Sequence, residues 1–134
     1  MNDRELVEFV AHGAKVITTK EVAETLAAMP EIERELAGID GKEYPHVAGH
    51  FRFLVQVIGD FVNGKFDALP YVAAAEVAFA LQYLHKEVDV IPDFVPHTGL
   101  LDDAMVAEIV LRRNAAVLKK HHAAGKIGWE TIEI

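Results

Sequence analysis

Apolar residues recur every three or four positions along most of this chain, and that spacing is the period of one face of an α-helix. The N-terminal part contains three such segments, and each of them is short. Their apolar positions are Leu6, Val7, Val10, Ala14 and Ile17, then Val22, Leu26 and Met29, then Ile32, Leu36 and Ile39. The pattern predicts three amphipathic helices that pack as a cover over the rest of the chain.

Local signals indicate where these helices begin and end. Thr18 followed by Glu21 predicts a capping box at the start of the second helix, because the hydroxyl and the carboxylate can each satisfy a free backbone amide. Pro30 suits the first turn of the third helix, where its missing amide loses no hydrogen bond. Gly38 and the Asp40-Gly41 pair indicate the end of that helix.

Three longer segments predict the core of the domain. The segment Tyr44–Val62 has a broad apolar stripe. Pro70 begins the next helix, Pro70–Lys86, which is apolar on nearly every side through Leu84; such a helix is usually central and buried. A final long helix is expected from Leu101 to Ala124, with Gly125 as its C-terminal cap.

The chain of 134 residues fits a single domain, residues 1–134. The fold expected is all-α: a compact multi-helix domain, orthogonal or bundle-like, of about six helices with an extended C-terminal tail. The tail, residues 129–134, alternates in a way that also suits a short strand pairing with another copy. A packed tail anchored by Trp129 is favoured, because one strand has no partner within an all-α domain.

Composition narrows the classes of function. The net charge of −8 argues against nucleic-acid binding, since affinity for phosphates comes mainly from clustered Lys and Arg. The most apolar window, Ala68 to Leu84, contains a carboxylate and is shorter than the roughly 20 residues that span a bilayer. The N-terminus has no signal-peptide pattern. We therefore expect a soluble, cytoplasmic protein without a membrane span.

Nucleophilic catalysis has few residues to use. The chain contains no serine and no cysteine, which removes the serine and cysteine triads. A phosphate-binding glycine loop is also missing from the sequence. Metal-dependent hydrolysis is the one enzyme class with suitable side chains.

The segment from Asp89 to Asp103 is unlike an ordinary solvent loop. Pro92 and Pro96 fix their own backbone angles and push the preceding residues toward an extended form. Between and around them lie large apolar residues, namely Val90, Ile91, Phe94, Val95, Leu100 and Leu101. The segment is expected to be rigid and packed against the domain.

This run, Asp-x-Ile-Pro-Asp-Phe-x-Pro-x-x-Gly-x-Leu-Asp-Asp, resembles the signature of the YkvA family, a domain of unknown function. The resemblance covers residues 71–111. The chain departs from the family's pattern at Lys86-Glu87, where a Ser-Pro pair is common, and at His97-Thr98, where apolar residues are common. The resemblance supports the fold and the importance of the segment, and it implies no reaction.

The favoured interpretation of the segment is a structural brace. Asp102 and Asp103 can accept hydrogen bonds from free amides at the start of the following helix and meet its positive end. Asp89 and Asp93 can bond backbone amides of turns. Pro92, Pro96 and Gly99 complete the structural motif.

The alternative is a site for a divalent cation such as Mg, Mn or Ca, whose ligands are carboxylate oxygens. Its residues would be Asp89, Asp93, Asp102 and Asp103, with His97 as a further ligand. The spacing matches no known calcium loop.

A second set of metal-ligating types lies on the predicted helices. His46 and His50 are four residues apart and share a helical face, and Glu76 and Glu108 lie on otherwise apolar helices. Together they would suit an iron or zinc site inside a bundle. The simpler interpretation, that His50 pairs with a nearby carboxylate or Glu76 with Arg52, is favoured because buried charges are usually paired.

The sequence therefore favours a non-catalytic interaction or scaffold module, as a homo-oligomer or with a protein partner. The alternative is a protein that binds a divalent metal through the aspartate segment. If it is an enzyme, the expected class is a metal-dependent hydrolase.

Overall fold

The computed structural model describes residues 3–39, 42, 46–85 and 100–121. Over these residues the secondary structure is helical, which confirms the all-α prediction. The helices are α1 (Asp3–Lys15), α2 (Thr19–Ala27), α3 (Met29–Ala37), α4 (Val47–Val62), α5 (Tyr71–Leu84), α6 (Leu100–Arg113) and α7 (Ala115–His121).

The local signals at the N-terminal helices work as the sequence predicts. The hydroxyl of Thr18 accepts from the amide of Glu21 at 3.2 Å, and the amide of Thr18 donates to the carboxylate of Glu21 at 3.1 Å. This is the predicted capping box at the start of α2. Pro30 lies in the first turn of α3, where a missing amide leaves no gap in the helix.

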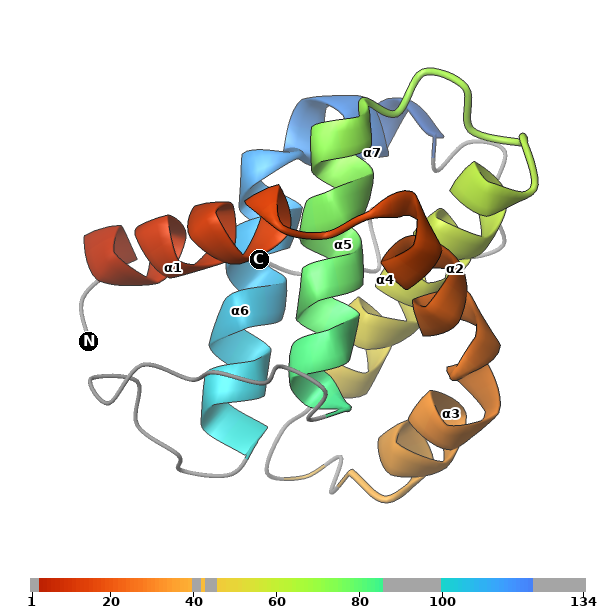
Figure 1. Ribbon diagram of the computed structural model, residues 1–134. Coiled ribbons are helices and arrows are strands. Elements are labelled where there is room, and N and C mark those ends of the chain that lie inside the picture. The colour runs from red at the N-terminus through yellow and green to blue at the C-terminus, as the bar shows by residue number, and fades with distance from the viewer. Residues whose placement is uncertain (1–2, 40–41, 43–45, 86–99, 122–134) are drawn as a thin grey trace.

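Helix α5 is the centre of the domain, as its sequence predicts. It packs against α1, α2, α4 and α6, and of the residues Ala73–Leu84 all but Gln82 are buried. Figure 1 shows α5 (green) between its neighbours, with α6 (cyan to blue) beside it and running the opposite way. A helix that is apolar on every side gains most from such a position, because each side faces another helix.

Helix α1 is more than a cover. It lies across α5 and α6 at a steep angle (Figure 1), and its Leu6 and Val10 are buried. Gly13 allows the close approach, since a Cβ atom there would come within 2.2 Å of the Phe79 ring. Phe9 and Phe79 meet edge to face, with ring centroids 5.4 Å apart. The N-terminal helix is therefore part of the core.

Two predicted boundaries were wrong. Helix α4 begins at Val47 rather than at position 44. The predicted long C-terminal helix is broken at Asn114 into α6 and α7, which gives seven helices over the described residues rather than about six. The side-chain amide of Asn114 donates to the carbonyl of Val110 at 2.9 Å, and such bonds to the preceding turn favour a bend over a regular helix.

The predicted C-terminal cap at Gly125 and the tail, residues 129–134, lie outside the described residues. Among the helices of the described part, none combines the length and the apolarity that crossing a bilayer requires.

Candidate functional site

The polar residues of the interior lie toward the two ends of α5. Helices α4 and α6 run opposite to α5 (Figure 1), so the starts of α4 and α6 lie near the end of α5. We call the group Glu76, Arg113 and Asn114 the Glu76 cluster. We call the group His50, Tyr83 and Asp103 the Asp103 end, because these residues come from the start of α4, the end of α5 and the start of α6.

The Glu76 cluster is a closed hydrogen-bonded group. The carboxylate of Glu76, which is 3% exposed, accepts from Nε and from a terminal nitrogen of Arg113, each at 3.1 Å. A third donor, the side-chain amide of Asn114, reaches Oε1 of Glu76 at 3.1 Å. Two parallel bonds from a guanidinium are the strong, planar form of this pair. The buried carboxylate is thus fully engaged by the end of α6.

The same contact changes the titration of Arg113. The hydrogen bond to Glu76 raises the pKa of Arg113 above its ordinary value, and this effect exceeds the lowering by burial. The guanidinium therefore stays charged at all ordinary pH values. The pairing of Glu76 with Arg52 was a wrong prediction: Arg52 lies 3.9 Å from Glu33.

The second predicted set of metal ligands is not assembled. His46 and His50 do share a face of the start of α4, with stacked rings 6.2 Å apart. Glu76, however, is held by Arg113 and Asn114, and Glu108 forms an ion pair with Arg112. Within the part of the chain that the structure describes, His, Asp and Glu side chains form no group of three that could hold a metal ion.

The Asp103 end buries polar side chains from three helices. His50, Tyr83 and Asp103 are 7%, 3% and 3% exposed. The Nε2 atom of His50, the hydroxyl of Tyr83 and Oδ1 of Asp103 are all shielded from solvent. The group lies where the segment of residues 86–99 joins α5 to α6.

Asp103 lies in the first turn of α6 and is buried. Helix α6 begins at Leu100, so Asp103 is its fourth residue and lies beyond the capping position. It lies on the same face of α6 as Val106 and Val110, which are both fully buried, because residues separated by three and by seven positions share one face of a helix. The signal was present in the sequence: the apolar stripe of α6 continues back onto an aspartate.

The other predicted site residues of the aspartate segment have no described side chain. Asp89, Pro92, Asp93, Pro96, His97 and Gly99 lie outside the described residues. Asp102 lies within α6, and its side chain is outside the described part. The structure therefore places one of the five proposed metal ligands, Asp103, and places it in the core.

Sequence reasoning missed four polar contacts that join helices. Arg113 and Asn114 are joined to Glu76, and the amide of Gln82 donates to the hydroxyl of Thr25 at 3.0 Å. His85 Nδ1 lies 2.6 Å from Oε1 of Glu35, which joins the end of α5 to α3. A carboxylate inside the most apolar helix signals that some partner must exist, and it does not say which one.

Three apolar side chains are exposed around the start of α5 and the turn after α1. Val16, Tyr71 and Val72, the apolar patch, are 72%, 41% and 62% exposed. The hydroxyl of Tyr71 donates to the carbonyl of Ile17 at 2.7 Å. That bond holds the start of α5 against the turn between α1 and α2.

Residues 73–109 match the family described as Protein of unknown function (DUF1232). The match begins in α5, passes through the aspartate segment and ends in α6. It confirms the resemblance carried by Asp89 to Asp103, and a YkvA-like domain is consistent with it. Neither the curated proteins nor the solved structures contain a match to this chain.

Proposed function

We propose that this chain is a non-catalytic interaction module that associates with a second copy of itself through the apolar patch. The observation that supports this most directly is the exposure of Val16, Tyr71 and Val72. Single exposed apolar residues are ordinary, but these three flank one contact, the hydrogen bond from Tyr71 to Ile17. Tyrosine is also among the residues that contribute most to protein interfaces.

The charge pattern favours a second copy as the partner. The net charge of the chain is −8, so two copies repel each other at most approaches. The patch is an exception, since residues 16–19 and 68–75 contain no charged side chain. Lys15 and Lys20 flank the first of these stretches. Two copies can therefore meet at this face without bringing carboxylates together.

The symmetry of such a contact adds support. In a twofold dimer the same patch of each partner forms the interface, so each apolar residue contributes buried area from both copies. A stable interface buries about 800 Å² on each partner, and the patch would form its centre with polar residues around it.

Sedimentation velocity over a range of protein concentrations tests this proposal. We expect the wild type to show a concentration-dependent dimer, and Val72→Glu to shift it to monomer, because a carboxylate would be buried at the contact. Val62→Glu is the matched control: Val62 is 41% exposed at the end of α4 and lies outside the patch. A monomeric wild type at all concentrations, or equal effects of the two variants, would overturn the proposal.

Divalent-metal binding by the aspartate segment is the second candidate function. The burial of Asp103 at the end of the domain where that segment joins favours it, since a buried carboxylate suits a hard cation. In thermal unfolding, millimolar Mg, Ca or Mn should then raise the melting temperature of the wild type and leave that of Asp93→Asn unchanged. A flat response to every metal would rule this candidate out.

A further inference from the structure

Helix α4 ends in a glycine cap. Asn63 is the C-cap residue, with φ −87° and ψ 8°, and Gly64 follows it with φ +74°. The amide of Gly64 donates to the carbonyl of Phe61 at 3.3 Å, and the amide of Lys65 donates to the carbonyl of Asp60 at 2.8 Å. These two bonds form a Schellman motif, whose left-handed position favours glycine. The way in which α4 ends therefore places a glycine directly after an asparagine.

The two residues of this cap are open to solvent. Asn63, Gly64 and Lys65 are all exposed, and a Cβ atom added at Gly64 would meet nothing within 4 Å beyond its neighbours in the chain. The next buried side chains along the chain are those of Phe66 and Leu69. Backbone hydrogen bonds at an exposed helix end open at a small cost in free energy, so this turn can open without disturbing the core.

This arrangement suits one reaction of asparagine. When the ψ bond of an asparagine rotates, the backbone nitrogen of the next residue can reach the side-chain carbonyl carbon and close a five-membered ring. A following glycine favours the step, because it has no Cβ atom that crowds the nitrogen and its backbone adopts many conformations. At Asn63 the rotation away from ψ 8° breaks the two bonds of the cap. Fraying of the last turn of α4 permits that rotation.

We propose that Asn63 is a site of spontaneous deamidation, with water as the co-reactant. The nitrogen of Gly64 bonds to Cγ of Asn63 and loses its proton, and the side-chain amide nitrogen leaves as ammonia. Water then opens the succinimide at one of its two C–N bonds. Opening at the side-chain carbonyl gives aspartate. Opening at the main-chain carbonyl gives isoaspartate, in which the backbone runs through the former side chain.

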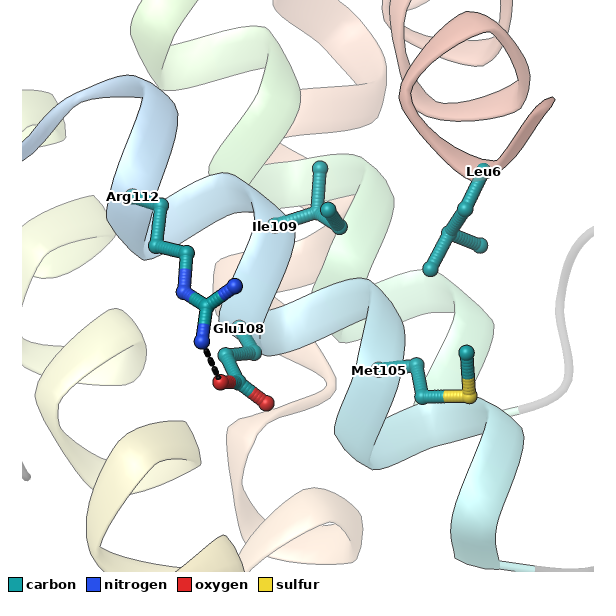
Figure 2. A pocket seen from close by; sticks show the side chains of 5 residues that line it. All are labelled: Leu6, Met105, Glu108, Ile109 and Arg112. Atoms are coloured by element: carbon teal, nitrogen blue, oxygen red, sulfur yellow. Dashed lines mark hydrogen bonds and ion pairs between the residues drawn. The ribbon is translucent and has the colours of Figure 1, made fainter. Parts of the chain in front are cut away.

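Asn114 provides a contrast within the same chain, because side-chain contacts hold the end of α6. Figure 2 shows Arg112 and Glu108 extending toward each other on α6, with their ion pair drawn as a dashed line. The side-chain amide of Asn114 donates to the carboxylate of Glu76 at 3.1 Å. The residue that follows is Ala115, whose Cβ atom crowds the attacking nitrogen. Both differences oppose ring closure, so Asn114 is expected to stay intact.

The products change the end of α4. Each adds one carboxylate at the C-terminus of the helix, where the helix dipole disfavours negative charge. Isoaspartate also inserts a methylene group into the backbone, so the two bonds of the cap no longer fit the same turn. We expect the converted chain to melt at a lower temperature than the unconverted one, and Asn63→Asp to reproduce the part of the shift that comes from the charge.

Peptide mapping of the full-length chain by mass spectrometry, after incubation at neutral and at mildly alkaline pH, tests the proposal. We expect the peptide with Asn63 to gain the mass difference between an amide and an acid. Its products should separate into isoaspartyl and aspartyl peaks. Conversion should be faster at the higher pH, because the attacking nitrogen must lose its proton. The peptide with Asn114 is the internal control and should keep its mass.

Two variants test the role of the ring. Gly64→Ala should slow the conversion severalfold, because it adds a Cβ atom beside the attacking nitrogen. Asn63→Gln covers the case in which that variant fails to fold. It keeps an amide at the cap but would need a six-membered ring, and its peptide should keep its mass.

Three outcomes would overturn the proposal. The first is an intact Asn63 in the folded chain, and a parallel incubation in urea would then show whether the cap protects it. The second is conversion to aspartate without isoaspartate, which would exclude the ring. The third is equal conversion of Asn63 and Asn114, which would remove the role of the glycine cap.

Discussion

The Glu76 cluster and the Asp103 end are two groups of buried polar side chains with different surroundings. Both bury titratable side chains near the central helix. In the Glu76 cluster the acceptor and its donors all lie in regular helix or beside it, and the group is closed by Arg113 and Asn114. At the Asp103 end, the buried polar groups come from three helices, and two of these helices, α5 and α6, flank the family motif along the chain.

The two groups also differ in how the family match covers them. The family match covers Glu76, Tyr83 and Asp103, but it ends at residue 109, before Arg113. The carboxylate of Glu76 accepts three hydrogen bonds from Arg113 and Asn114, which tie α5 to the end of α6.

The largest expected effect is at the Glu76 cluster. Arg113→Ala removes the guanidinium and leaves a buried carboxylate without its ion-pair partner. Losing one member of a buried pair costs about 3 to 5 kcal/mol, and we expect the lower figure because Arg113 is partly exposed. Urea unfolding measures this loss.

Two comparisons check that result. Arg112→Ala, which breaks the exposed pair with Glu108, should cost less than about 1 kcal/mol. The raised pKa of Arg113 means that its contribution is present below its ordinary pKa and is lost only as the pH rises through the raised value. The difference between wild type and Arg113→Ala should therefore hold from neutral to mildly alkaline pH; a steep loss there would contradict the assignment.

The next effect is expected midway along α5, where no polar group is involved. Gly13→Ala places a methyl group within 2.2 Å of the Phe79 ring, and such overpacking costs about 1 to 3 kcal/mol. Gly49→Ala is the matched control, since nothing lies within 4 Å of its added Cβ. Calorimetry should show a lower melting temperature for the first variant and an unchanged or higher one for the second.

A smaller effect is expected at the Asp103 end. Asp103→Asn keeps the shape of the side chain but removes its charge, and we expect a loss of about 1 to 2 kcal/mol in thermal or urea unfolding. Asp103→Leu should be at least as destabilising. If leucine instead raises the stability, the carboxylate has no polar role, and the Asp103 end loses its standing as a candidate site.

The smallest effect is expected at the start of α5. Tyr71→Phe removes the hydroxyl that donates to Ile17 and should cost about 1 kcal/mol. The ring remains, so the sedimentation behaviour of the chain should not change. If Tyr71→Phe instead abolishes association and leaves stability unchanged, the hydroxyl serves the interface rather than the fold.

Local features of the fold were predictable from the sequence. The capping box at Thr18 and Glu21 and the central place of α5 depend on neighbours in the chain or on the apolar content of one helix. The partner of Glu76 was not predictable, because Arg113 is 37 positions away and Arg52 was an equally reasonable choice. For Asp103 the sequence predicted a place at the start of the following helix or a role as a cation ligand. Its burial in the core depends on how α6 packs against other helices, which the local pattern does not specify.

The break at Asn114 also sets the direction in which the chain leaves the domain. An unbroken helix would carry residues 115–121 about 10 Å further along the axis of α6. In the structure Leu118 on α7 is fully buried, so α7 packs against the body of the molecule. The side-chain amide of Asn114 donates to the carbonyl of Val110 and to the carboxylate of Glu76. The residue at the break between α6 and α7 therefore also binds the buried carboxylate.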